Sequence, residues 1–159
     1  LAHAKGFDIL IDAFFELTIT HPDLFLVILG EGKDKELLHN KIKQLDLEDK
    51  IFMPGYVQNV YSYFKEAEVC VLSSRIEGFP NVLLQMMSQN TKVVATLSAG
   101  GIDEIPGLFT CATENATLLR EAIEIALGSP SENLAPKFKA LLTQRSLAGF
   151  YKSIITNSK

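Results

Sequence analysis

The spacing of apolar residues in this chain switches repeatedly between two patterns, and this alternation restricts the folds that the chain can adopt. From Phe7 to Leu17 the apolar residues recur every three or four positions, whereas Leu24 to Leu29 is an unbroken apolar run that ends at Gly30. The first pattern indicates one face of a helix, and the second suits a strand buried in a parallel sheet. Alternating helices and strands form right-handed βαβ units. We therefore expect a doubly wound α/β domain with a parallel sheet covered on both sides.

The same two patterns divide the rest of the chain. Further helices are expected at residues 38–45, 60–67, 80–89 and 119–128, and further strands at residues 51–53, 68–72, 92–96 and 108–111. The last of these helices should bury one face, formed by Leu119, Ala122, Ile123 and Ala126. A helical core spacing in the third helix predicts packing, and not stacking on a base, for Tyr61, Tyr63 and Phe64.

Length and composition favour one folded domain followed by docked helices. A chain of 159 residues, 47% of them hydrophobic, can bury a substantial core. Residues 1–128 are expected to form the domain. Residues 129–159 are more polar, and one or two helices there should pack on it through Phe138, Leu141, Leu142, Phe150 and Ile154.

Charge and cysteine content exclude several classes of protein. A net charge of -4 argues against a general nucleic-acid surface. The chain has no run of about 18 apolar residues, so no membrane span is expected. Cys70 and Cys111 lie in apolar runs without a CxxC spacing, which predicts two reduced core thiols in a cytoplasmic protein. No paired carboxylates or clustered histidines indicate a metal site, and His3, His21 and His39 are expected at the surface.

One segment combines several features of a ligand site. Residues 73–85 follow an expected buried strand and open a helix at Pro80, whose missing N–H suits a first turn. A helix N-terminus at the end of a strand attracts anions. Gly78 would let backbone approach a ligand, and Glu77 could accept hydrogen bonds from sugar hydroxyls. Taken alone, a Gly-Pro turn with a solvent-facing carboxylate explains the same residues.

The sequence of this segment resembles that of a known family. Residues 77–84 read E-G-F-P-N-V-L-L, which is similar to the signature of the retaining GT-B glycosyltransferases grouped as family four. Residues 5–14 resemble the family's K-G-x-x-x-L-I-x-A-F, residues 30–32 its G-x-G turn, and residues 52–57 its F-x-G-Y-V. The resemblance covers residues 5–104 in family order. It implies a Rossmann-like domain, the C-terminal half of a GT-B fold.

The resemblance also implies roles for single residues. Lys5 would neutralise the diphosphate of a nucleotide sugar, and Glu77 would bind hydroxyls of its sugar, so these two are the candidate catalytic residues. The remaining candidates would bind the substrate: Gly78, Phe79, Pro80 and Asn81 the sugar and phosphates, Gly30, Glu31, Tyr56 and Val57 the base, and Gln85 the ribose. Such enzymes usually need no metal or other cofactor. The alternative for Lys5 is an ordinary solvated lysine.

Two residues and one loop depart from the family pattern. Gln85 stands where the family usually has a glutamate that accepts hydrogen bonds from the ribose, and an amide lacks the charge that strengthens such bonds. Asn90 stands where relatives carry glycine, and a left-handed helix end would explain an asparagine there. The loop between Gly101 and Leu108 looks short, which leaves the sugar specificity open.

The expected function is donor binding within a hexosyl-type retaining glycosyltransferase of polysaccharide biosynthesis. The donor would be a UDP- or GDP-linked sugar, and the acceptor a glycan or a lipid-linked molecule held by an N-terminal domain outside this chain. The chain alone should therefore bind donor better than it transfers sugar. The full-length protein is expected in the cytoplasm, with attachment at the inner face of the membrane as an option. Two alternatives stay open: a sugar-nucleotide-binding module without catalysis, and a flavodoxin-like signalling or phosphate-binding domain.

Overall fold

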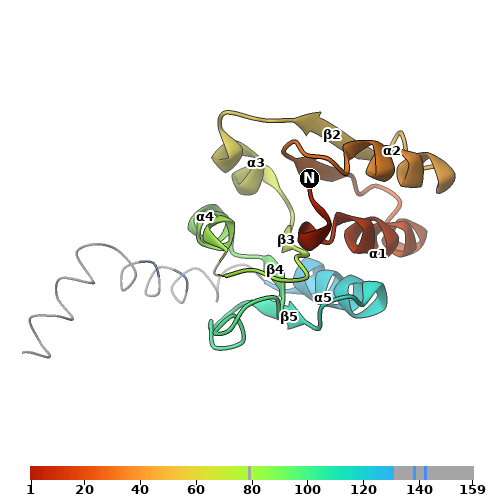
Figure 1. Ribbon diagram of the computed structural model, residues 1–159. Coiled ribbons are helices and arrows are strands. Elements are labelled where there is room, and N and C mark those ends of the chain that lie inside the picture. Colours follow the sequence, from red (N-terminus) through yellow and green to blue (C-terminus); the bar gives the residue numbers. More distant parts are fainter. Residues whose placement is uncertain (79, 131–137, 139–141, 143–159) are drawn as a thin grey trace, which may run out of the picture.

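The predicted succession of helices and strands is present in the structure. The computed structural model of the chain describes residues 1–78, 80–130, 138 and 142 (Figure 1). Its strands are β1 (Leu26–Leu29), β2 (Ile51–Gly55), β3 (Cys70–Leu72), β4 (Val93–Thr96) and β5 (Phe109–Cys111). Its helices are α1 (Phe7–Thr20), α2 (Lys35–Gln44), α3 (Val60–Glu66), α4 (Asn81–Gln89) and α5 (Ala116–Gly128), preceded by a 3-10 turn, η1 (His3–Lys5). Of these, only η1 has no counterpart in the apolar pattern.

All pairings between the described strands are parallel, which confirms the predicted α/β class. The strands are divided between two sheets, one of β1 and β2 and one of β3, β4 and β5. Helix α1 packs against both α2 and α5 and lies between them in Figure 1. Its buried residues share one core with Ile28 of β1 and with Val94 of β4. Helix α1 thus connects the two sheets on one side.

The second side of the three-stranded sheet is covered as well. Val93 and Ala95 of β4 pack with Leu83 of α4 and Phe64 of α3 in a second core. Because side chains alternate along a strand, β4 is buried on both faces, as a doubly wound sheet requires. The carboxyl ends of β3, β4 and β5 therefore lie together at one edge of this sheet, between the two helical layers.

Most side chains lie where the sequence places them. The four residues of the expected apolar face of α5 are all buried. Cys70 and Cys111 are buried, and burial raises the pKa of their thiols to about 12 and about 11, so both are unreactive. Phe138 is buried in the second core, and Leu142 is half-buried. Leu141, Phe150 and Ile154 lie outside the described residues, so the docking of residues 129–159 stays a prediction.

The prediction of core packing was wrong for Tyr61 and Tyr63. Phe64 is buried, but the two tyrosines are 44% and 40% exposed. Helix α3 has only seven residues and buries a single side chain among them. A short helix at the edge of the fold offers the core too narrow a face for three aromatic rings.

The left-handed conformation expected at Asn90 was also wrong. Asn90 has φ -133 and ψ 145, which is extended backbone leading into β4. Its side chain explains the residue instead, because Nδ2 donates to the carbonyls of Phe64 at 2.8 Å and Ala67 at 2.6 Å, and Oδ1 accepts from the Lys92 N–H at 2.8 Å. Asn90 therefore satisfies carbonyls at the end of α3 that the helix itself leaves unpaired.

None of the helices described is both long and apolar enough to cross a membrane.

Candidate functional site

The candidate residues gather where the strands end. The loops after β1 and β2 carry Glu31 and Tyr56, and the loop after β3 carries Glu77. In doubly wound folds, ligands bind beyond the carboxyl ends of the strands. The candidates in these loops form two groups, one around Glu77 at the end of the three-stranded sheet and one around Glu31 at the end of the two-stranded sheet.

Lys5 and Glu77 form the centre of the first group. The Lys5 ammonium donates to Oε1 of Glu77 at 2.6 Å, although the two residues are 72 positions apart in the chain. Ser74 donates its hydroxyl to the same oxygen at 2.7 Å. The Lys5 side chain remains 44% exposed, whereas that of Glu77 is only 14% exposed. The carboxylate is thus held in place, and the ammonium remains accessible to a ligand.

The environment of Glu77 keeps its side chain ionised. Burial by itself raises the pKa of this carboxyl, but the hydrogen bonds from Lys5 and Ser74 and the positive charge of Lys5 outweigh it. The pKa of Glu77 therefore lies below its ordinary value. At neutral pH, Glu77 is a charged acceptor for hydroxyl groups.

The turn that carries Lys5 approaches the β3 loop very closely. Gly6 has φ +62, a left-handed conformation, and a Cβ at this position would lie 2.1 Å from the carbonyl oxygen of Ser73. The Ser73 hydroxyl donates to the Lys5 carbonyl at 2.9 Å. Only glycine permits both this conformation and this contact. The structure therefore requires the glycine of the K-G pair, whatever the role of the lysine.

The start of α4 lies immediately after Glu77 in the chain. Helix α4 begins at Asn81, and Pro80 is its N-cap. The sequence predicts Pro80 as the first helical residue, so the helix begins one residue later than expected. Asn81 is exposed and Gln85 is half-buried. Because they are four residues apart, they share one face of the helix. Gly78 is exposed, with open space where a Cβ would lie, and Phe79 lies outside the described residues.

The second group is formed where β1 and β2 end. The Gly30 N–H donates to the Gly55 carbonyl at 2.8 Å, which brings the two loops together. Glu31, the next residue, forms an ion pair with Lys35 at 3.1 Å. Its side chain lies close to Gly55, where an added Cβ would be 2.2 Å from Oε1 of Glu31. Tyr56 is 79% exposed, and Val57 is half-buried. An exposed aromatic side chain beside polar loops offers a surface on which a base can stack.

The first five residues connect the two groups. The backbone nitrogen of Leu1 donates to the Glu31 carbonyl, and the Asp34 N–H donates to the Leu1 carbonyl at 3.2 Å. Lys5, four residues later, reaches Glu77. This segment therefore joins the loop after β1, which carries Glu31, to the loop after β3, which carries Glu77.

Three further residues contribute to the site, although the sequence did not single them out as candidates. Ser74 holds Glu77, as described above, and Arg75 makes ion pairs with Asp8 and Glu114. Ser98 accepts the Glu77 N–H at its carbonyl, at 2.8 Å. The Ser98 hydroxyl is buried and has no hydrogen-bond partner among the described residues. Ser74 and Arg75 lie inside the motif segment; Ser74 bonds Glu77 three positions later, whereas the partners of Arg75 are far away in the sequence.

The described residues hold no group of three or more His, Cys, Asp or Glu side chains placed to bind a metal ion.

The chain is similar to many known glycosyltransferases. The model of the family described as "Glycosyl transferases group 1" matches residues 1–140. An uncharacterized glycosyltransferase of Haemophilus influenzae is 28% identical over 142 residues, covering 87% of this chain and 40% of that protein. The N-acetylgalactosamine-N,N'-diacetylbacillosaminyl-diphospho-undecaprenol 4-alpha-N-acetylgalactosaminyltransferase of Campylobacter jejuni is 38% identical over 107 residues, covering 67% of this chain and 28% of that protein. The chain thus spans less than half the length of either relative.

Solved structures share the fold. The structure of HepE from Anabaena in complex with UDP superposes with a TM-score of 0.84 at 20% identity, over 100% of this chain and 47% of that one. The C-terminal domain of a glycosyl transferase group 1 family protein from Francisella tularensis gives a TM-score of 0.78 at 21% identity, over 91% of this chain and 81% of that one. The predicted fold, the Rossmann-like C-terminal half of a GT-B protein, is confirmed.

Proposed function

This chain belongs to the glycosyl transferases group 1, and from that premise we propose that it binds the nucleotide-diphosphate sugar donor of a retaining, hexosyl-type glycosyltransferase. The sugar would pass to a glycan or a lipid-linked acceptor held by an N-terminal domain of the full-length protein. The donor-binding unit comprises residues 1–128 in this proposal.

The pairing of Lys5 with Glu77 is the observation that carries the proposal. A cation for the diphosphate and an anion for the sugar hydroxyls lie 2.6 Å apart, just before the start of α4. The first N–H groups of a helix lack partners within it and favour negative charge. Lys5 and the α4 N-terminus would together stabilise the departing diphosphate, which is preorganised electrostatic catalysis. Gly78, Pro80, Asn81 and the undescribed Phe79 would surround the sugar and phosphates.

The second group would hold the nucleoside. Tyr56 offers an exposed ring, and Gly30 lies beside it with Glu31 and Val57, so the base would bind at the ends of β1 and β2. Gln85 shares the face of α4 that begins at Asn81 and would accept from the ribose. The Anabaena neighbour was solved with UDP, which supports a uridine or a similar nucleotide in the proposal.

A metal-free titration tests this proposal. We expect the chain to bind at least one of UDP, GDP and ADP, and more tightly the corresponding nucleotide sugar, in calorimetry with EDTA present. The reason is that Lys5 and the helix N-terminus supply the positive charge that a divalent cation would otherwise provide. Binding that requires added magnesium or manganese would contradict this electrostatic scheme, and binding of none of the nucleotides would contradict donor binding itself.

The alternative, a binding module without catalysis, is favoured by one observation, the amide at Gln85. Transfer of sugar by the full-length protein, assayed with a panel of nucleotide sugars, separates the two. Donor binding without transfer to any acceptor would favour the module.

The departure at Gln85 yields a prediction of its own. Gln85→Glu should tighten donor binding by about 1 kcal/mol, since a hydrogen bond to a charged acceptor is stronger than one to an amide. Isothermal titration with nucleotide and nucleotide sugar measures the change. Gln89→Glu is the matched control, because it makes the same substitution one turn further along α4. An unchanged or weaker affinity in Gln85→Glu would place residue 85 outside the ribose contact.

A further inference from the structure

The side chain of Arg75 connects three segments around the candidate site. Its Nη1 donates to the His3 carbonyl at 2.7 Å and to Oδ1 of Asp8 at 2.8 Å, and its Nη2 donates to Oδ2 of Asp8 at 2.7 Å. Its Nε donates to Oε1 of Glu114 at 2.6 Å. The guanidinium thus joins η1, the first turn of α1 and the loop after β5. The Arg75 side chain is only 12% exposed, and each of its three nitrogens is engaged.

The backbone around Arg75 holds the same turn. The Arg75 N–H donates to the Ala4 carbonyl at 2.8 Å, and the Ser73 hydroxyl donates to the Lys5 carbonyl. Three consecutive carbonyls of η1, those of residues 3, 4 and 5, are therefore held by residues 73 and 75. Glu77 follows two residues later on the same loop. The backbones that carry Lys5 and Glu77 are in effect tied to one another through Arg75.

We propose that Arg75 is a positioning residue that fixes Lys5 against Glu77, and thereby sets donor affinity without contacting the donor. The proposal rests on the proposed function. An exposed ion pair between a lysine and a carboxylate ordinarily contributes little free energy, because the long flexible lysine side chain must be ordered to form it. Anchoring the backbone at both ends reduces that cost and holds the two groups in a defined geometry. A planar guanidinium is suited to this task, since it bonds both oxygens of Asp8 and still reaches two other segments.

Charge makes the connection specific to arginine. Two carboxylates, Asp8 and Glu114, converge on one guanidinium, and its hydrogen bonds lower the pKa of Asp8. Without the cation these carboxylates repel one another, and the His3 carbonyl keeps only the Gly6 N–H as a donor. The turn with Lys5 would then move away from the β3 loop.

Arg75→Gln and Arg75→Lys test the proposal in this chain. The glutamine variant should weaken both UDP and UDP-sugar binding, or those of whichever nucleotide the wild type prefers, by roughly tenfold or more, as expected when a charged hydrogen-bond partner is misplaced. The lysine variant keeps the charge but lacks the fork, so its loss should be smaller and still at least roughly threefold. Affinity is measured by calorimetry well below the unfolding temperature of each variant.

A second measurement needs no ligand. Carboxyl NMR titration reports the pKa of Glu77, which the hydrogen bonds from Lys5 and Ser74 hold down. In Arg75→Gln this pKa should rise toward its ordinary value, because Lys5 has moved away. Should the wild type bind none of the nucleotides, the proposed function fails, and the pKa of Glu77 still decides whether Arg75 positions Lys5.

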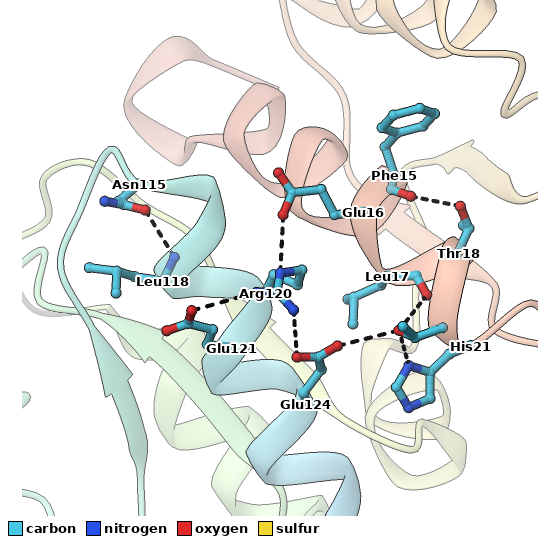
Figure 2. Close-up of polar contacts among 11 residues, drawn as sticks. Phe15, Glu16, Leu17, Thr18, His21, Asn115, Leu118, Arg120, Glu121 and Glu124 are labelled. Atoms are coloured by element: carbon cyan, nitrogen blue, oxygen red, sulfur yellow. Dashed lines mark hydrogen bonds and ion pairs between the residues drawn. The ribbon is translucent and has the colours of Figure 1, made fainter.

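Arg120→Gln is the matched control for a purely structural role. Arg120 makes ion pairs with Glu16 of α1 and with Glu121 and Glu124 of α5, and its side chain is 24% exposed (Figure 2). Arg120 connects two helices much as Arg75 connects three segments, but none of the partners of Arg120 is a candidate site residue. Arg120→Gln should lower the melting temperature and leave both the donor affinity and the pKa of Glu77 unchanged.

The two readouts decide the proposal in every case. If Arg75→Gln lowers the melting temperature as Arg120→Gln does, but leaves affinity and the pKa of Glu77 as in the wild type, Arg75 serves stability alone and the proposal is wrong. Should Arg75→Gln not fold, Arg75→Lys decides. Wild-type affinity and a wild-type Glu77 pKa in that variant would overturn the proposal.

Discussion

Glu77→Ala should weaken binding of the nucleotide sugar and leave binding of the bare nucleoside diphosphate nearly unchanged, whereas Lys5→Ala should weaken both. The physical reason is that the two side chains would bind different parts of the donor: the Glu77 carboxylate the sugar hydroxyls, and the Lys5 ammonium the diphosphate. Removing one partner of a hydrogen bond to a charged group costs about 1.5 to 3 kcal/mol, or roughly 10- to 100-fold in affinity. Calorimetry with the preferred nucleotide and its sugar derivative resolves such changes.

An ion pair elsewhere in the fold provides the control. Lys41 and Asp12 are also 2.6 Å apart, but they join α2 to α1 away from the strand ends. Lys41→Ala and Asp12→Ala should leave the affinity for both ligands as it is. If Glu77→Ala weakens both ligands equally, the glutamate shapes the loop and does not contact the sugar. If neither Lys5→Ala nor Glu77→Ala has an effect, both are ordinary surface residues.

Transfer by the full-length protein extends the same prediction. Glu77→Ala should also reduce the transfer rate, because a sugar that is no longer held in one orientation loses the proximity that catalysis requires.

Gly6→Ala should be the most destabilising single change among those considered, lowering the free energy of unfolding by about 3 kcal/mol or more. Two costs add. An alanine at φ +62 is strained, and its Cβ would lie 2.1 Å from the Ser73 carbonyl oxygen, so the turn and the β3 loop must separate. Because this turn carries Lys5, donor binding should be lost with the stability. Urea unfolding and calorimetry measure the two effects.

Gly128→Ala is the control for this substitution. Gly128 ends α5, no atom outside its own helix backbone and chain neighbours lies within 4 Å of a Cβ built there, and its φ is not left-handed. Alanine has the higher helix propensity, so this variant should be as stable as the wild type or more stable by up to about 1 kcal/mol. A Gly6→Ala variant that unfolds and binds like Gly128→Ala would show that the turn does not depend on glycine.

The sequence alone determined the elements and the family. Apolar spacing predicted every described strand and α-helix, and the buried face of α5, because such patterns reflect contacts that each element makes along its own length. The motif of residues 77–84 identified the loop after β3, since a strand, a glycine and a helix start are local features. The membership in the glycosyl transferases group 1 follows from the same order of motifs.

The tertiary structure decided which side chains meet. Lys5 reaches Glu77 across 72 positions, and Arg75 bonds Asp8, Glu114 and two carbonyls of η1. No periodicity in the sequence predicts any of these contacts. Asn90 was expected to be left-handed from its place at a helix end, yet its amide is engaged with the end of α3. A hydrogen bond between distant segments depends on where the fold brings them, and one sequence records the two partners without recording that they pair.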